Sequence, residues 1–130
     1  MHIPLDKKLE HSADFKVEYR FYSKEEGGRD TIPYQGYRSD FWYEHPDHHQ
    51  MYVFMIWPEF ENTNGEVILD DKQSVQSTGI ARMWVIDPLK RKYHLDKIAV
   101  GLKGYFMEGS KRVAECKVIE ISGLAINPIE

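Results

Sequence analysis

Short stretches of alternating apolar and polar residues, separated by turn residues, constrain the fold of this chain more than any other feature. Residues 15–22 alternate in this way, which is the pattern of a half-buried strand. No window sustains apolar residues at helical spacing, so we expect very little helix. Short strands at regular spacing predict an all-β sandwich or barrel. The further predicted strands are 40–44, 51–57, 66–70, 80–87, 97–106 and 111–121.

The composition describes an ordinary globular domain. The 130 residues are enough for one domain with a single core, and 42% of them are hydrophobic. The net charge of −4 argues against a general nucleic-acid-binding role, because phosphate binding relies on a basic surface. One cysteine excludes an internal disulfide. The longest apolar run, 51–57, is shorter than the ~20 residues that span a bilayer. We therefore expect a cytoplasmic protein without a membrane segment.

The connection between the first two predicted strands is unusual. Gly27 and Gly28 are followed by Arg29, Pro33 and Arg38. Paired glycines permit backbone angles with φ > 0, and proline fixes its own φ while biasing the residue before it toward an extended conformation. We predict a stiff loop that holds both arginines in a fixed relation.

This segment carries a family resemblance. EEGGRDTIPYQGYRSDFWY (25–43) resembles the start of the third domain of bacterial elongation factor Tu, whose pattern is roughly EEGGRHTPFFxGYRPQFYF. MEGSKRVAECKV (107–118) resembles REGGRTVGAGVV of the same domain, and NGEVILDDKQSVQSTG (64–79) matches mainly in spacing. The resemblance implies a single closed antiparallel β-barrel of about six strands. It places the barrel at 14–122, between a flexible N-terminal tail (1–13) and a C-terminal tail (123–130).

The resemblance does not extend to GTP chemistry. Elongation factor Tu hydrolyses GTP in a separate first domain built on a phosphate-binding loop. This sequence contains no GxxxxGK[ST] motif and no pattern of a βαβ unit to carry one. We therefore expect neither GTP binding nor GTPase activity, and no cofactor.

The resemblance also implies a candidate tRNA surface. In the family, the arginine of the first motif and the Glu-Gly pair of the last hairpin contact the T-stem of tRNA, and here these are Arg29, Glu108 and Gly109. The alternative is that Gly109 only makes a turn and Arg29 is a solvated loop cation. Asp30 and Asp40 replace a histidine and a glutamine of the family pattern, and their carboxylates would repel phosphate. Binding of tRNA is possible but disfavoured.

Residues 44–63 form an insertion relative to the family pattern. They contain the predicted strand 51–57, which either lengthens a hairpin or adds a strand at the edge of the barrel. The odd-numbered residues are expected to cover the core and the even-numbered ones to face outward. The outward set is apolar, so core packing and a partner or homodimer surface both stay open as interpretations of this strand. The residues predicted to bind a partner on this arm are Tyr52, Phe54 and Trp57.

Evidence for metal binding or catalysis is weak. His45, His48 and His49 are candidate metal ligands, but adjacent residues of a strand point to opposite faces, and a solvated turn explains the cluster better than a metal site. Ser110 lies in a turn without a nucleophile-elbow pattern, and Cys116 is expected to pack in a strand. We predict no enzyme activity and treat a metal-dependent enzyme as a remote alternative.

The sequence therefore predicts a non-catalytic binding module. We expect a protein partner, connected with translation or with a regulatory or immunity-like role, and a homodimer is also compatible. The main alternative is an RNA-binding module on the same inherited face, which would show steep salt dependence. The residues assigned to that face are Arg29, Arg38, Glu108 and Gly109.

Overall fold

The computed structural model describes residues 1–45 and 53–130. Its regular secondary structure is mostly strand, with two short α-helices and one turn of 3-10 helix, so the predicted all-β class is confirmed. In chain order the elements are α1 (Leu5–Leu9), β1 (Phe15–Phe21), β2 (Asp40–Tyr43), β3 (Ile56–Phe60), β4 (Thr78–Val85), η1 (Pro88–Lys90), α2 (Arg91–Leu95), β5 (Lys103–Glu108) and β6 (Lys111–Ile121).

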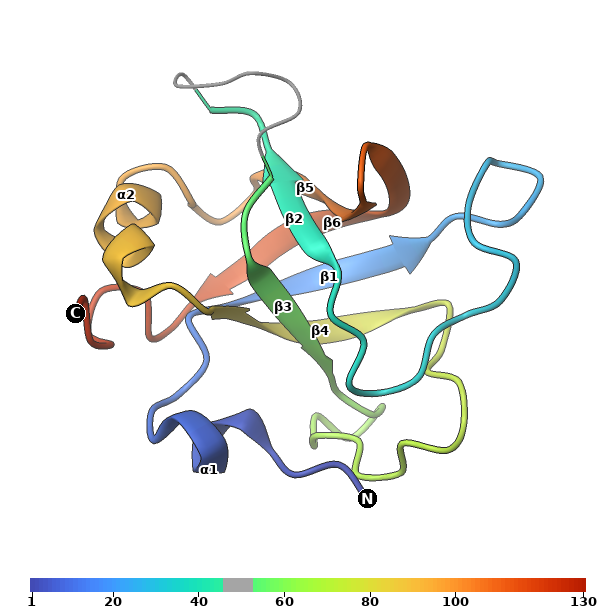
Figure 1. Cartoon of the computed structure of the whole chain (residues 1–130), viewed down its shortest axis with the longest axis horizontal. Helices are drawn as coiled ribbons and strands as arrows, with labels where there is room; N and C mark the ends of the chain where they lie inside the picture. The colour runs from blue at the N-terminus through green and yellow to red at the C-terminus, as the bar shows by residue number, and fades with distance from the viewer. Residues whose placement is uncertain (46–52) are drawn as a thin grey trace.

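The strands form one six-stranded antiparallel sheet in the order β2-β5-β6-β1-β4-β3. β1 lies in its interior, and its side chains alternate between buried and more exposed as the sequence predicts. Figure 1 shows β2 and β3 passing in front of the other strands, so the sheet curls around its own core. That core is rich in aromatic rings: Phe15, Phe41, Phe60 and Phe106 are fully buried.

The sheet is curled but is not the closed barrel that we expected. Among the described residues, β2 meets the chain leading into β3 at one bridge, between Phe41 and Phe54, with both N–O distances 2.9 Å. Beyond this bridge, the side-chain amide of Gln35 takes the place of a neighbouring strand. Its Nε2 donates to the Phe60 carbonyl (3.0 Å), and its Oε1 accepts from the Phe60 N–H (2.9 Å). A loop side chain thus pairs with the edge of β3 at Phe60, whose carbonyl also accepts from the Ile68 N–H at 3.1 Å.

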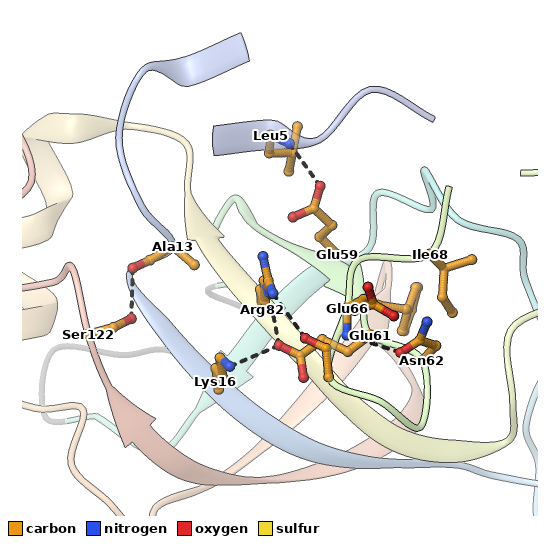
Figure 2. A network of polar contacts seen from close by, with 12 residues as sticks. Leu5, Ala13, Lys16, Glu59, Glu61, Asn62, Glu66, Ile68, Arg82 and Ser122 are labelled. Atoms are coloured by element: carbon orange, nitrogen blue, oxygen red, sulfur yellow. Dashed lines mark hydrogen bonds and ion pairs between the residues drawn. The ribbon is translucent and has the colours of Figure 1, made fainter. Parts of the chain in front are cut away.

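The N-terminal segment 1–13 was expected to be a loose tail, and this expectation is wrong. Its helix α1 lies against β3, where the buried carboxylate of Glu59 accepts hydrogen bonds from the Leu5 N–H (2.8 Å) and the His2 ring (2.7 Å). Figure 2 shows Glu59 reaching up from β3 to the start of the helix. The helix buries none of its residues, so polar contacts dominate its attachment.

The C-terminal segment 123–130 is also docked rather than free. Leu124 is 2% exposed, and the buried Asn127 donates to the Ser12 carbonyl at 2.7 Å. Arg91 of α2 donates to the Pro128 carbonyl. These long-range contacts leave no periodic signal in the sequence, which is why the sequence predicts tails at both ends.

Three predicted strands are wrong in whole or in part. Of the predicted strand 51–57, the described residues 53–55 form only an isolated bridge at Phe54, and β3 begins at Ile56 and continues to Phe60. Residues 66–70 form only an isolated bridge between Val67 and Glu61. The predicted strand 97–106 begins only at Lys103, after a turn at Gly101 with φ 95°. Among the described residues, no helix has the length and the apolar character that a membrane crossing requires.

Candidate functional site

The glycine-arginine loop and the last hairpin lie side by side. Arg29 forms an ion pair with Glu108 at the end of β5, and the hydroxyl of Tyr37 donates to the same carboxylate. The Arg29 guanidinium also lies over the Tyr37 ring, 4.9 Å from its centroid. Arg29 and Glu108, which are 79 positions apart in the sequence, are thus in direct contact. The two motifs that carry the family resemblance therefore meet in space.

The paired glycines allow the loop to turn tightly enough for this contact. Gly27 has φ 90°, a conformation that side chains rarely adopt. At Gly28 the constraint is space, because a Cβ there would lie 2.2 Å from the Tyr22 carbonyl oxygen. The Gly28 carbonyl in turn accepts a hydrogen bond from Lys111 Nζ at 3.1 Å. The loop is therefore attached to the hairpin through its backbone as well as through Arg29.

The environment of Glu108 favours its ionised form. Burial by itself would raise the pKa of this carboxyl, but hydrogen bonds from Tyr37 and Arg29 outweigh burial, and the pKa lies below its usual value. A lowered pKa in the folded state means that the native protein binds fewer protons than the unfolded chain. The contribution of Glu108 to stability is therefore present above the ordinary carboxyl pKa and is lost as the pH falls through the lowered one.

We expect Glu108→Gln to weaken the acid sensitivity of this region. Between about pH 6 and about pH 3, the melting temperature of the wild type should fall further than that of the variant, because only the wild type loses this ion pair. Thermal unfolding followed by circular dichroism measures the difference. Glu25→Gln, an exposed site in the same loop, is the matched control. Identical pH profiles for the Glu108 variant and the wild type would contradict the assigned role of the carboxylate.

A second cation–aromatic pair extends the surface toward β3. The guanidinium of Arg38 lies 4.5 Å from the centroid of a ring of Trp57. Arg38 is exposed, while Trp57 is half-buried and points away from the core. The sequence assigned Arg38 to the inherited face and Trp57 to the inserted arm. The structure places these two residues against each other.

We call this combined surface the loop face and define it by six residues: Arg29, Tyr34, Tyr37, Arg38, Trp57 and Glu108. It borders two hollows. One, of about 520 Å³, is lined by loop residues from Arg29 to Tyr37, including the 53%-exposed ring of Tyr34. The other, of about 60 Å³, lies between Arg38, Trp57 and the N-terminal segment. Tyr37 lines both hollows, so the surface is continuous across them.

Sequence reasoning missed Tyr34 and Tyr37. Both follow Pro33 within the predicted stiff loop. An aromatic residue on a restrained surface loop is typical of a binding site, so this pattern could have identified them. Gly109, which was predicted, lies next to Glu108 with φ 61° and makes the hairpin turn. It positions Glu108 and presents no side chain of its own.

The inserted arm faces the opposite way from our expectation. Phe54 is 5% exposed and Ile56 is fully buried, whereas Met55 is 49% exposed. Phe54 stacks on Tyr43 with ring centroids 5.4 Å apart, so it belongs to the core rather than to a partner surface. Both faces of this strand are apolar in sequence, so alternation alone could not choose between them. Tyr52, the remaining predicted arm residue, lies outside the described residues.

The structure provides no support for the metal hypothesis. His45 is buried, with its Nδ1 3.1 Å from the Tyr93 hydroxyl, while His48 and His49 lie outside the described residues. Across 1–45 and 53–130, no three His, Cys, Asp or Glu side chains come together as a metal site would require. Cys116 is buried, and burial raises the pKa of its thiol, which disfavours the reactive thiolate.

The acids that were expected to disfavour phosphate lie close to the loop face. Asp30 pairs with Lys24 at 3.6 Å, and Asp40 stands opposite Met107 in the β2–β5 ladder, one residue from Glu108. The loop face and its border therefore combine arginines with carboxylates rather than forming a basic patch.

Comparison with known proteins adds no assignment. A scan against models of protein families matches none of them, and a search of curated proteins likewise finds no match. The relation to elongation factor Tu stays a prediction that depends on the two motifs.

Proposed function

We propose that this protein is a non-catalytic binding module that recognises a protein partner through the loop face. The observation that carries the proposal is the gathering of arginine, tyrosine and tryptophan side chains on one restrained surface. These residue types dominate the energetic centres of protein interfaces. Arg29 is held by Glu108 and Arg38 by Trp57, so part of the ordering cost of binding is already met in the free protein.

The charges of the loop face favour a protein over RNA. RNA affinity depends on cations that are available to neutralise phosphate. Arg29 is already paired with Glu108, whose lowered pKa keeps it ionised, and Asp30 and Asp40 add negative charge nearby. The Glu108 carboxylate contacts both Arg29 and Tyr37. This group of donors and acceptors suits a protein partner, which offers both donors and acceptors of hydrogen bonds. RNA binding remains the competing hypothesis for the same surface.

A link to translation depends on the family resemblance. The motif containing Arg29 and the motif containing Glu108 are the residues that carry the likeness, and their contact supports a common origin with the elongation factor Tu third domain. The resemblance implies that such a domain contacts other proteins as well as RNA. We therefore propose a partner from translation, with a regulatory or immunity-like role as the alternative.

Affinity capture with matched variants tests the proposal. The tagged wild type should capture a stoichiometric protein from native lysate, and Tyr34→Ala and Arg38→Ala should each weaken capture by about tenfold or more, because exposed aromatic and arginine side chains supply most interface energy. Leu89→Ala is the control, since Leu89 is 70% exposed but belongs to η1 rather than to the loop face. Equal loss with all three variants, or with none, would reject the loop face as the binding surface.

A salt titration separates the two ligand classes. Binding of tRNA to the purified protein should be weak and, if present, should fall steeply as salt rises, with a shallower slope for Arg29→Met. A protein partner should bind with much weaker salt dependence. Tight tRNA binding that Arg29→Met weakens would replace the protein-binding proposal by the RNA alternative.

A further inference from the structure

The N-terminal segment shields an acidic side chain of β3, although none of its own residues is buried. We call residues 1–9 the strap. Its apolar members Ile3 and Leu9 are 54% and 38% exposed. Under the strap, Glu59 is only 1% exposed, and Figure 2 shows its side chain reaching up to Leu5. The strap thus covers a carboxylate but gains little from apolar burial, which is the dominant favourable term in folding.

The strap satisfies only one of the two carboxylate oxygens of Glu59. The Leu5 N–H donates to Oε2 at 2.8 Å, and the His2 ring donates to the same atom at 2.7 Å. The other oxygen, Oε1, is buried and has no hydrogen-bond partner among the described residues. A buried carboxylate oxygen without a donor has lost its hydration uncompensated. The strap is therefore an incomplete ligand for this carboxylate.

The cation that faces Glu59 across the strands is engaged elsewhere. Arg82 stands directly opposite Glu59 in the β3–β4 ladder. Its Nε donates to the Glu61 carboxylate at 2.9 Å, and its Nη2 donates to the Gly65 carbonyl at 3.2 Å. Among the described residues, Glu59 has an ion-pair contact with the His2 ring and none with a lysine or arginine. Its carboxylate therefore keeps the capacity to bind one more cation.

The surface around Glu59 continues the loop face. Trp57 lies two residues before Glu59 on β3 and directly opposite Trp84 on β4, so the three side chains share the outer face of the sheet. Trp84 is 1% exposed, and its indole Nε1 is a buried donor without a partner among the described residues. The hollow of about 60 Å³ joins the strap to Arg38 and Trp57 of the loop face. A partner seated on the loop face therefore reaches the strap directly.

We propose that the strap is a displaceable cover over a site for an arginine side chain of the partner protein. A guanidinium presents parallel N–H donors that match both oxygens of one carboxylate, so it satisfies Oε1 of Glu59 as well as Oε2. The strap offers both of its donors to Oε2 alone. A lysine ammonium is a point charge and lacks this match. The inference rests on the proposed function, because the partner of the loop face supplies the arginine.

The strap and the arginine compete for the same carboxylate. The apparent affinity for arginine is reduced to the extent that the strap stays in place, so a weaker strap should raise that affinity without any new contact. Leu5→Pro removes one strap donor with little strain. Leu5 is the first residue of α1, where proline is well accommodated, and Pro4 before it already has the extended φ −53° and ψ 139° that a following proline requires.

The test is a titration of the whole chain with the peptide acetyl-Ala-Arg-Ala-amide, followed in ¹H–¹⁵N spectra. We expect saturable shifts of the Glu59 amide and the Trp84 indole signals. Leu5→Pro should bind the peptide about tenfold more tightly than the wild type, because one hydrogen bond to a charged group no longer holds the strap. The same peptide with citrulline in place of arginine should bind at least about tenfold more weakly, since citrulline keeps the shape but lacks the charge.

Further variants assign the contacts. His2→Phe, which removes the other strap donor, should reproduce the gain in affinity, and adding Glu59→Gln to Leu5→Pro should abolish it. Leu9→Ala, at the far end of α1, should bind as the wild type does. The proposal is overturned if Leu5→Pro shows no saturable shift, if the citrulline peptide binds equally well, or if Leu5→Ala, which keeps the N–H, gains as much as Leu5→Pro.

Failure of this inference differs from failure of the proposed function. Capture that Tyr34→Ala and Arg38→Ala weaken, without any binding of the arginine peptide, would reject the site under the strap and leave the loop face in place. Peptide binding that Leu5→Pro strengthens, with capture unaffected by both loop-face variants, would support the arginine site and reject the loop face.

Discussion

Replacing Arg91 with methionine should lower the free energy of unfolding by about 3–5 kcal/mol, the range for removing one partner of a buried ion pair. Arg91 is 2% exposed and Asp14 is fully buried, and Arg91 Nε lies 2.7 Å from Asp14 Oδ1. Without the guanidinium, the carboxylate of Asp14 would stay buried with an uncompensated charge. A loss of this size is a large fraction of the stability of a typical single domain.

The position of the pair explains the size of the effect. Arg91 also donates to the Val85 carbonyl at 2.9 Å, and Asp14 accepts from the Val85 N–H at 2.8 Å and from Asn127 at 3.0 Å. The cluster thus joins the entry to β1, the end of β4, α2 and the C-terminal segment. Its removal should loosen all of these elements together.

Urea unfolding followed by tryptophan fluorescence measures this loss. Arg20→Met is the matched control, because Arg20 also pairs with carboxylates, those of Glu26 and Glu115, but on the exposed surface. The double variant Asp14→Leu with Arg91→Met should recover part of the stability, since no buried charge is then left alone. If Arg91→Met costs no more than Arg20→Met, the buried pair does not have the role assigned here.

Gln35→Glu should be strongly destabilising at neutral pH. Gln35 is 5% exposed, and its Nε2 donates to the carbonyls of Phe60 (3.0 Å) and Ile68 (2.9 Å). A carboxylate would replace that donor by a negative charge facing two carbonyl oxygens. We expect a loss of about 3 kcal/mol or more, from unpaired buried groups and from burial of the charge.

The pH dependence of the unfolding free energy shows whether Gln35→Glu destabilises the protein through its buried charge or through the loss of the amide alone. Burial beside carbonyl oxygens should raise the pKa of the introduced carboxyl in the folded state. Stability is then greatest below the ordinary carboxyl pKa and falls as the pH rises through the raised one. Gln35→Met has similar length but no charge, so its loss should not follow this profile. Thermal unfolding from about pH 4 to about pH 8 makes the comparison, and parallel profiles for the two variants would contradict burial of the charge.

Local patterns predicted the interior of the sheet well. β1 and β6 lie close to where the alternation of apolar and polar residues placed them, because each has one face on the core and one toward solvent. The helix α2 was missed since its five residues are too short for a periodic signal. Its position depends on Arg91 and His94, whose partners Asp14 and Tyr43 are distant in sequence.

For the candidate site too, the sequence predicted some residues, whereas their contacts depended on the tertiary structure. The two motifs located Arg29 and Glu108, and their contact required the curled sheet to bring the loop against the last hairpin. The pairing of Arg38 with Trp57 could not be read from sequence, because it depends on which face of the inserted strand turns outward. A shift of one residue in that strand would have exchanged Trp57 for Ile56.

The sequence by itself determined the class of fold, the interior strands β1 and β6 and the turn at the paired glycines, because these follow from side-chain periodicity and from the backbone freedom of glycine. Tertiary structure alone decided that the sheet stays curled with Gln35 along the β3 edge, that both ends dock, and that Phe54 turns inward. These outcomes depend on contacts between residues far apart in the chain. Their free energy comes from burial and pairing, which local sequence does not encode.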